Sequence, residues 1–170
     1  MSYDTGIVRP EMRDGDVCLR IGTVSGARLT RIKKGLLTLH TLELMAVNIY
    51  RCQITPCATE FNRHLIAAMC NEMTHLQDFQ VKLCEYGWRP SRLRWAYAIV
   101  GCLFGTCSRL MGARAILRMG IWVETKAVRH YAELLATIDW DEETRAIIEK
   151  NQADERGHVE RWKRMLGGNG

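Results

Sequence analysis

The chain has 170 residues, of which 47% are hydrophobic and 25% are charged, and its formal net charge at pH 7 is +5. This composition is typical of one soluble globular domain with a sizeable core, and the modest charge predicts no nucleic-acid partner. The longest apolar run is under eighteen residues and the first thirty residues have no hydrophobic signal core. We therefore expect neither a membrane-spanning helix nor a secretory leader, and we expect a cytoplasmic location.

Seven cysteines are scattered along the chain without any Cys-x2-Cys pair. An odd number of dispersed cysteines is more typical of reduced thiols in or near a core than of disulfides or a zinc site. Basic residues gather around the expected helix ends. They form either an ordinary solvated face or a surface for an anionic membrane or an acidic partner.

Residues 1–31 contain four glycines and no sustained hydrophobic period. Only Val17–Thr23 alternates in the manner of a short strand, so we expect an N-terminal arm with at most a small hairpin. The remaining residues, 32–170, are expected to form one helical domain. Its first helix is predicted over Lys33–Arg51.

Three further helical segments follow. The second helix is predicted over Cys57–Tyr86, where apolar residues recur at alternating spacings of three and four and Gly87 supplies the stop. The third is predicted over Ser91–Arg109. Its apolar stretch, Trp95–Cys107, is too short to span a bilayer but long enough for a core or interfacial helix. The fourth is predicted over Ala113–Ala136.

The last helix is expected to begin after Asp139, because Asp139-x2-Glu142 is typical of a capping box.

One motif occurs twice along the chain, and its two copies lie on four of the five predicted helices. In each copy a solitary Glu is followed seven residues later by a Tyr. A Glu-x2-His pair begins about thirty residues after the same solitary Glu. The two copies comprise Glu43, Tyr50, Glu72 and His75, and then Glu124, Tyr131, Glu155 and His158.

Residues three apart on a helix lie within about 60° of one another, so the Glu and His of each pair can reach the same ion. Random placement of 12 Glu and 5 His among 170 residues gives roughly 0.35 such pairs, so two pairs are uncommon. Four carboxylates and two imidazoles on four helices are the ligand set of ferritin-like di-iron and di-manganese bundles. The sequence thus predicts an all-α, ferritin-like antiparallel four-helix bundle with an additional helix between bundle helices two and three.

The predicted metal ligands are Glu43, Glu72, His75, Glu124, Glu155 and His158. The carboxylates of the two Glu-x2-His pairs are expected to bridge the ions, and the two solitary glutamates to be terminal ligands. Carboxylate-rich sites prefer iron or manganese to zinc or copper, and the analogy favours two iron ions.

Other side chains are expected to lie around the ligands. Tyr50 and Tyr131 are two turns beyond the solitary glutamates, and His40 is one turn before the first of them. A redox role for the tyrosines is one alternative, and packing or hydrogen bonding behind the ligands is the other. Phe79 and Trp162 each follow a pair glutamate by seven residues and are expected to pack beside the site.

Five segments between Lys33 and Trp162 resemble the demethoxyubiquinone hydroxylase family of ubiquinone biosynthesis. They are Thr41–Tyr50, Asn71–His75, Gly87–Pro90, Val123–Tyr131 and Asp154–His158. In that family a carboxylate-bridged di-iron centre activates O2 to hydroxylate a quinone ring, and the protein lies peripherally on a membrane. The apolar segment Trp95–Gly105 resembles the family's membrane-facing helix.

The resemblance implies a di-iron monooxygenase whose partners are O2, a quinone or related lipid-like substrate and an electron donor. It also implies peripheral contact with the inner face of a membrane, and leaves a homodimer open. Two alternatives stand beside it: a ferritin-like protein that oxidises iron or reduces peroxide, and a metal-stabilised binding module without turnover.

Overall fold

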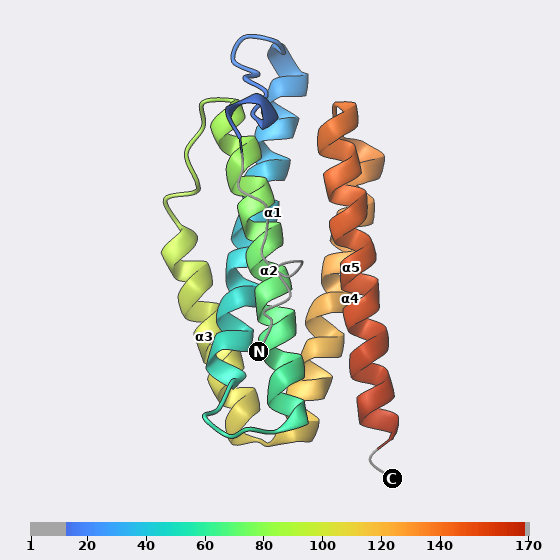
Figure 1. Ribbon diagram of the computed structural model, residues 1–170. Coiled ribbons are helices and arrows are strands. Elements are labelled where there is room, and N and C mark those ends of the chain that lie inside the picture. Colours follow the sequence, from blue (N-terminus) through green and yellow to red (C-terminus); the bar gives the residue numbers. More distant parts are fainter. Residues whose placement is uncertain (1–12, 169–170) are drawn as a thin grey trace.

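The computed structural model describes residues 13–168, and all regular secondary structure within that range is helical (Figure 1). A single 3-10 turn, η2 (Asp14–Asp16), precedes five α-helices, which confirms the predicted all-α, ferritin-like class. The helices are α1 (Gly26–Gln53), α2 (Glu60–Glu85), α3 (Arg94–Leu110), α4 (Ala113–Thr137) and α5 (Glu142–Gly167).

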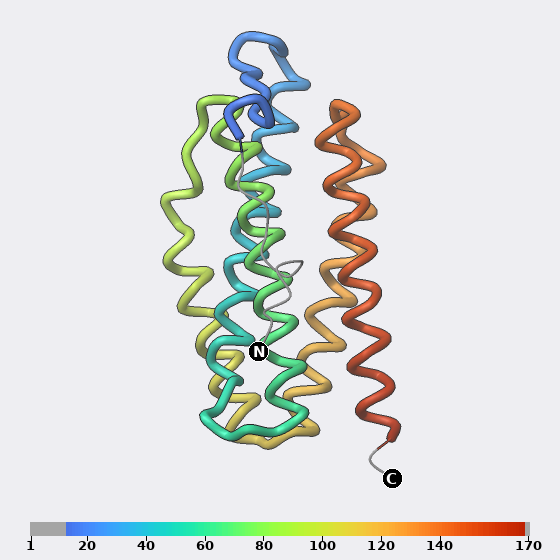
Figure 2. Tube along the Cα trace, viewed as in Figure 1, coloured from blue at the N-terminus to red at the C-terminus, as the bar shows by residue number. Residues whose placement is uncertain are grey.

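The bundle consists of two antiparallel hairpins. Helix α1 packs along α2, and α4 packs along α5, while α3 lies against the outer side of α1 (Figure 2). The backbones come closer within each hairpin than between the hairpins. Side chains therefore fill the space between the two halves, and the repeated motif places one copy of its residues in each half.

The core consists of two apolar clusters, one toward each end of the bundle. One cluster includes Leu36, Phe79, Tyr131 and Ile148, and the other includes Tyr50, Ala68, Leu117 and Trp162. On each of the four bundle helices at least one buried polar side chain lies between the two clusters. This buried polar layer is where the predicted ligands lie.

Helix α1 begins earlier than predicted, at Gly26 rather than at Lys33. The extra turns are held by tertiary contacts that local sequence does not reveal. Ile32 is fully buried in the core, and the guanidinium of Arg28 contacts the carboxylate of Asp139 at 3.0 Å and its carbonyl oxygen at 2.9 Å.

The predicted capping box at Asp139 is wrong, because Asp139 is engaged with Arg28. Helix α5 is capped two residues later by Asp141, whose carboxylate accepts a hydrogen bond from the backbone N–H of Thr144 at 3.0 Å. Helix α2 likewise begins after Thr59 rather than at Cys57. The remaining predicted helix ends differ by no more than three residues from the observed ones.

The expected hairpin does not form in the described part of the arm, residues 13–25, where no strand occurs; residues 1–12 lie outside the described range. Instead, Arg20 fixes this segment to the bundle. Its backbone N–H donates to the carbonyl oxygen of Glu85 at 2.8 Å, and its guanidinium contacts the Glu85 carboxylate at 2.9 Å. Lys82, which is 2% exposed, contacts Glu85 at 3.0 Å and Glu143 at 2.6 Å.

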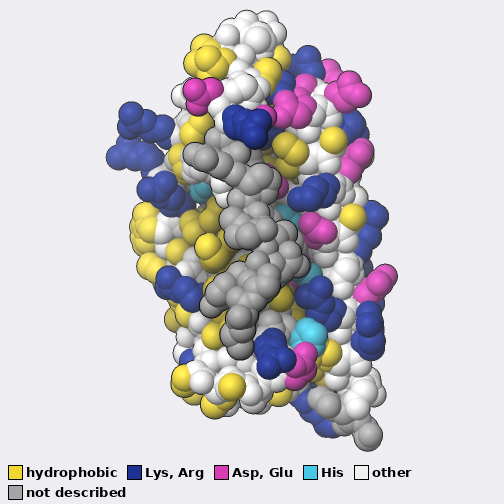
Figure 3. All heavy atoms as spheres, viewed as in Figure 1, with side chains coloured by type: hydrophobic (Ala, Val, Ile, Leu, Met, Phe, Trp, Pro, Cys, Tyr) yellow, Lys and Arg dark blue, Asp and Glu magenta, His cyan; other side chains and the backbone are white. Residues whose placement is uncertain are grey.

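The third helix packs against α1 with almost no space between the backbones. A β-carbon at Gly101 would lie 2.4 Å from the carbonyl oxygen of Met45, and one at Gly105 would lie 2.3 Å from that of Ile49. The outer face of α3 is apolar and exposed. Hydrophobic side chains gather on this side of the molecule in Figure 3. None of the helices in the described range is long and apolar enough to cross a membrane.

The sequence predicts reduced thiols in the core or half-buried beside it, but most of the cysteines lie farther out than that. All seven are free thiols, and none is buried: Cys52 and Cys102 are half-buried between α1 and α3, and the other five are exposed.

Candidate metal centre

The six predicted ligand residues come together in the polar layer, and each is at most 3% exposed. Two of the four helices each contribute one glutamate, and the other two each contribute a Glu-x2-His pair. The residues are Glu43 on α1, Glu72 and His75 on α2, Glu124 on α4, and Glu155 and His158 on α5.

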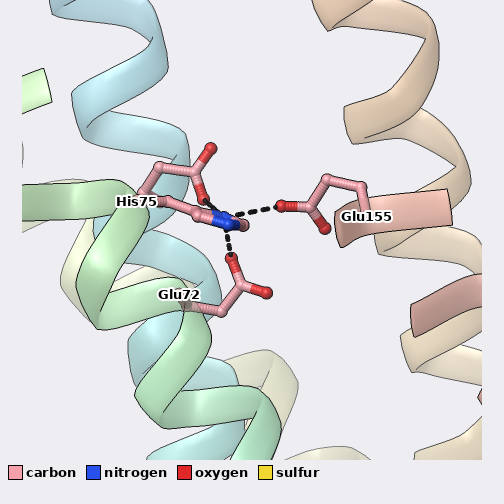
Figure 4. A group of neighbouring side chains, drawn as sticks. Glu72, His75 and Glu155 are labelled. Carbon is pink, nitrogen blue, oxygen red and sulfur yellow. Dashed lines mark ion pairs between the residues drawn. The ribbon is translucent and has the colours of Figure 1, made fainter. Parts of the chain in front are cut away.

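Their side-chain atoms form two groups that could each hold a metal ion, with the atoms of a group within 4.8 Å of one another. In the first group, Nδ1 of His75 lies 3.1 Å from Glu155, 3.5 Å from Glu72 and 3.7 Å from Glu43. Figure 4 shows the side chains of Glu72, His75 and Glu155 pointing toward one another from α2 and α5.

The second group mirrors the first. Nδ1 of His158 lies 3.1 Å from Glu72, 3.7 Å from Glu155 and 3.9 Å from Glu124. Glu72 and Glu155 belong to both groups, whereas each solitary glutamate belongs to one. The geometry therefore contains two adjacent positions that share two carboxylates.

Several ligand atoms of this cage have no hydrogen-bond partner, although the imidazoles and carboxylates form ion pairs with one another. Thirteen buried side-chain polar atoms in the described residues lack a hydrogen-bond partner, and six of them belong to Glu72, His75, Glu155 and His158. Buried polar atoms are normally paired, and a cluster of unpaired oxygen and nitrogen atoms needs a compensating charge. Hard cations that accept carboxylate and imidazole ligands fit this donor set.

The charges in the cage are strongly coupled. Burial raises the pKa of Glu43 and of Glu124 well above the usual range for a carboxyl group. Burial also opposes ionisation of Glu72, but the imidazoles of His158 and His75 outweigh it and lower the pKa of Glu72 to about 2. Burial thus favours the neutral form of Glu43 and Glu124, whereas the imidazoles favour the charged form of Glu72.

The two imidazoles respond in the opposite sense. Burial lowers the pKa of each, but the facing carboxylates outweigh burial, so the pKa of His75 is strongly raised and that of His158 rises to about 9. At neutral pH protons on the imidazoles therefore compensate part of the carboxylate charge. Bound cations would take over this role and displace the protons.

The two motif tyrosines cross between the hairpins. Tyr131 on α4 donates from its hydroxyl to Oε1 of Glu43 on α1 at 2.5 Å, and Tyr50 on α1 donates to Oε1 of Glu124 on α4. Both tyrosines are buried, and burial raises the pKa of each. Each solitary glutamate is therefore oriented by the tyrosine of the opposite hairpin.

The residues behind the tyrosines differ between the two copies of the motif. Nε1 of Trp162 donates to the hydroxyl oxygen of Tyr50 at 3.1 Å, with the two rings 6.0 Å apart. Phe79 occupies the corresponding place beside Tyr131, at 6.1 Å between rings, and has no hydrogen to donate. Both aromatic residues pack beside the site, as the sequence predicted.

His40 lies apart from the cage. It is 4% exposed, its Nε2 is 3.1 Å from Oε1 of Gln80, and it belongs to neither metal-binding group. Burial lowers its pKa. It lines a cavity of about 540 Å³ with Met73 and Trp95, among other residues of α1, α2 and α3.

A different cavity reaches the cage. It has a volume of about 510 Å³, and all four cage glutamates line it. Its walls come mainly from α1 and α4. The apolar lining residues are Leu42, Met45, Ala46, Trp122, Val123 and Ala127, and the charged or polar ones away from the cage are Lys126, Arg129, His130 and Glu133.

Asp154 contacts a cage residue, and the sequence pattern did not predict this contact. Oδ2 of Asp154 lies 3.2 Å from Nε2 of His75, on the side of the imidazole that faces away from the cage. Asp154 immediately precedes Glu155, so it adjoins the repeated motif. The corresponding residue of the other copy is Asn71, and a comparison of the two copies at this position could have singled it out.

Comparison with known proteins places these features in a family. Residues 31–163 match the family model described as ubiquinone biosynthesis protein COQ7. The mitochondrial NADPH-dependent 3-demethoxyubiquinone 3-hydroxylase of Dictyostelium discoideum is 32% identical over 126 residues, which are 71% of this chain and 58% of that relative.

Bacterial relatives give the same result. The 3-demethoxyubiquinol 3-hydroxylase of Polaromonas sp. is 30% identical over 125 residues, 71% of this chain and 59% of the relative. That of Bordetella avium is 29% identical over 130 residues, 75% of this chain and 60% of the relative. The chain thus spans about three fifths of the length of these relatives. It belongs to the COQ7 family of ubiquinone biosynthesis proteins, within the ferritin-like di-iron superfamily.

Proposed function

We propose that this protein is a di-iron monooxygenase that uses O2 to hydroxylate a quinone or quinol ring. The observation that carries the proposal is the pair of adjacent metal-binding groups that share Glu72 and Glu155 at the base of a cavity of about 510 Å³. The names of the relatives, which refer to 3-demethoxyubiquinol or 3-demethoxyubiquinone, support this substrate class.

The proposed ligand roles follow from which group contains each residue. Glu43 and His75 would hold one ion and Glu124 and His158 the other, and Glu72 and Glu155, which belong to both groups, would be shared by the two. Two iron ions bound there supply the redox chemistry that activates O2, and manganese is the alternative metal for the same donor set.

The protein's own contribution is orientation and the exclusion of water. Tyr131 and Tyr50 hold the terminal glutamates in place through their hydroxyl groups. Apolar clusters lie on either side of the polar layer, which limits the access of water to the cage from the two ends of the bundle. A planar ring fits between apolar walls of this kind, and a cavity of this size is in the usual range for small-molecule sites.

We further propose that the exposed face of α3 contacts the inner face of a membrane, from which a lipid-like substrate would be drawn. Trp95, Ile99 and Leu103 are each more than half exposed on this helix, and Arg94 and Arg109 lie at its ends. An apolar face with basic flanks is suited to an anionic lipid surface. Replacing Trp95 with Asp should reduce co-flotation with vesicles that contain an anionic lipid; unchanged flotation would contradict this role for α3.

The catalytic proposal is tested with protein reconstituted anaerobically with ferrous iron, a short-chain 3-demethoxyubiquinol, a reductant and 18O2. The name of the Dictyostelium relative makes NADPH the first electron donor to try, with a chemical reductant beside it. The expected product carries one 18O atom on the ring. The absence of labelled product from protein that holds two irons per chain would contradict the proposal.

Two variants of α5 sharpen this test. Glu155→Ala should abolish labelled product because Glu155 belongs to both metal-binding groups. Glu149→Ala should leave it unchanged, because Glu149 is exposed, pairs with Arg145 at 3.7 Å and belongs to neither group. Rapid oxidation of added iron to a mineral, with no conversion of the quinol, would instead favour a ferritin-like iron-oxidising protein. Bound iron with neither reaction would favour a binding module.

A further inference from the structure

The two copies of the motif differ at one position that touches the cage. Asn71 and Asp154 each stand directly before the glutamate of a Glu-x2-His pair, so they have the same register on α2 and α5. One is a neutral amide and the other a carboxylic acid. The two halves of an otherwise two-fold site therefore present different groups to the imidazoles.

Asp154 orients the imidazole of the opposite hairpin. Its Oδ2 lies 3.2 Å from Nε2 of His75, and the same imidazole turns Nδ1 toward Glu155 and Glu72. An ionised carboxylate can only accept, so this contact requires the hydrogen of His75 to be on Nε2. Nδ1 then offers its lone pair to a cation inside the cage once that cation displaces its proton.

The other copy lacks this arrangement. Oδ1 of Asn71 is buried without a hydrogen-bond partner, and among the described residues the recorded contacts of His158 with acidic groups are all made by Nδ1. A neutral amide would in any case form a weaker hydrogen bond to an imidazole than a carboxylate does. His158 is consequently less firmly oriented than His75.

From this difference, and resting on the metal centre proposed above, we propose that Asp154 is a positioning residue that makes the two metal positions unequal. The position built on Glu43 and His75 binds its ion more tightly and fills first. Carboxylates that accept from a metal-bound histidine typically change metal affinity by about 10-fold to 100-fold, so the two dissociation constants should differ by a factor in that range.

The test is a titration of the metal-free protein with Co2+, followed by visible absorption and by calorimetry. Wild type should bind two ions in two resolved steps. In Asp154→Asn the affinity of the first step should fall by about 10-fold to 100-fold, whereas the affinity of the second step should change little. The two binding steps should then no longer be resolved. Asn has the same shape as Asp, and the Asp154 side chain is 37% exposed, so the variant is expected to fold; circular dichroism checks this.

Glu149→Gln is the matched control, because it also removes one acidic charge from α5 but its carboxylate contacts Arg145 and belongs to neither metal-binding group. It should leave both steps unchanged. A spectroscopic measurement distinguishes a lost hydrogen bond to His75 from a general loss of metal affinity. In the Co2+-loaded protein the ring N–H of His75 should exchange slowly with solvent, and Asp154→Asn should accelerate that exchange.

Three results would overturn the inference: two equal steps in wild type, an unchanged first step in Asp154→Asn, or equal losses in Asp154→Asn and Glu149→Gln. None of these would affect the metal centre itself. Failure of wild type to bind Co2+ or Fe2+ at all would contradict the proposed function instead, so the two failures are distinguishable.

Discussion

Removing metal from the cage should leave a protein whose stability falls as the pH rises from neutral to alkaline. The pKa of His158 rises from the ordinary 6.5 to about 9 in the folded chain because carboxylates face it in spite of its burial. A group whose folded pKa exceeds its unfolded pKa stabilises the fold fully below the unfolded value, and this contribution is lost as the pH rises through the folded value. At about 1.4 kcal/mol per pKa unit, His158 contributes roughly 3 kcal/mol that disappears between about pH 6.5 and pH 9.

The measurement is urea unfolding of chelator-treated, reduced protein at about pH 6.5 and about pH 9.5. We expect the unfolding free energy of the metal-free protein to be lower at the higher pH, and the raised pKa of His75 adds to this loss with the same sign. In His158→Gln the difference between the two pH values should shrink by roughly 3 kcal/mol. Equal unfolding free energies for metal-free wild type at both pH values would refute the reasoning.

Three further predictions concern the surroundings of the cage. Tyr131→Phe removes the donor to buried Glu43 and should lower the unfolding free energy by about 1–3 kcal/mol in urea titrations; a neutral effect would mean that this hydrogen bond does not orient Glu43. Gly105→Ala places a β-carbon 2.3 Å from the carbonyl oxygen of Ile49 and should lower the unfolding free energy by about 1–3 kcal/mol. Gly157→Ala, whose β-carbon would have nothing within 4 Å, should raise it by up to about 1 kcal/mol. The opposite order of stabilities would contradict the close packing of α3. Metal at about 100 times its dissociation constant should add about 2.7 kcal/mol per ion to the unfolding free energy, and calorimetric scans with and without chelator should show a higher melting temperature for the loaded protein.

The sequence was informative about the cage because its chemistry follows helical periodicity. Glu72 and His75 are three residues apart, so any helix through them places both on one face, and the second copy repeats the spacing. The long amphipathic helices could be located for the same reason. Composition alone does not indicate that the two copies of the motif lie close together. That prediction depends on the six ligands, which match a centre surrounded by four helices.

Contacts between the two hairpins could not be predicted from the sequence. Nothing local indicates that Tyr131 reaches Glu43 on another helix, or that Asp154 reaches His75. The early start of α1 was missed for a similar reason, because it depends on the contact between Arg28 and a residue more than a hundred positions away. Periodicity identifies which face a residue occupies, and tertiary packing alone decides what that face meets.

The arrangement of two positions with two shared carboxylates is tested most directly by counting ferrous iron bound per chain under anaerobic conditions. Wild type should bind about two ions, and Glu124→Ala, which removes a residue that belongs to one group only, should bind about one. Glu72→Ala should lose both, because Glu72 belongs to both groups. Fewer than about two ions in wild type, or an undiminished count in Glu72→Ala, would contradict the di-iron cage.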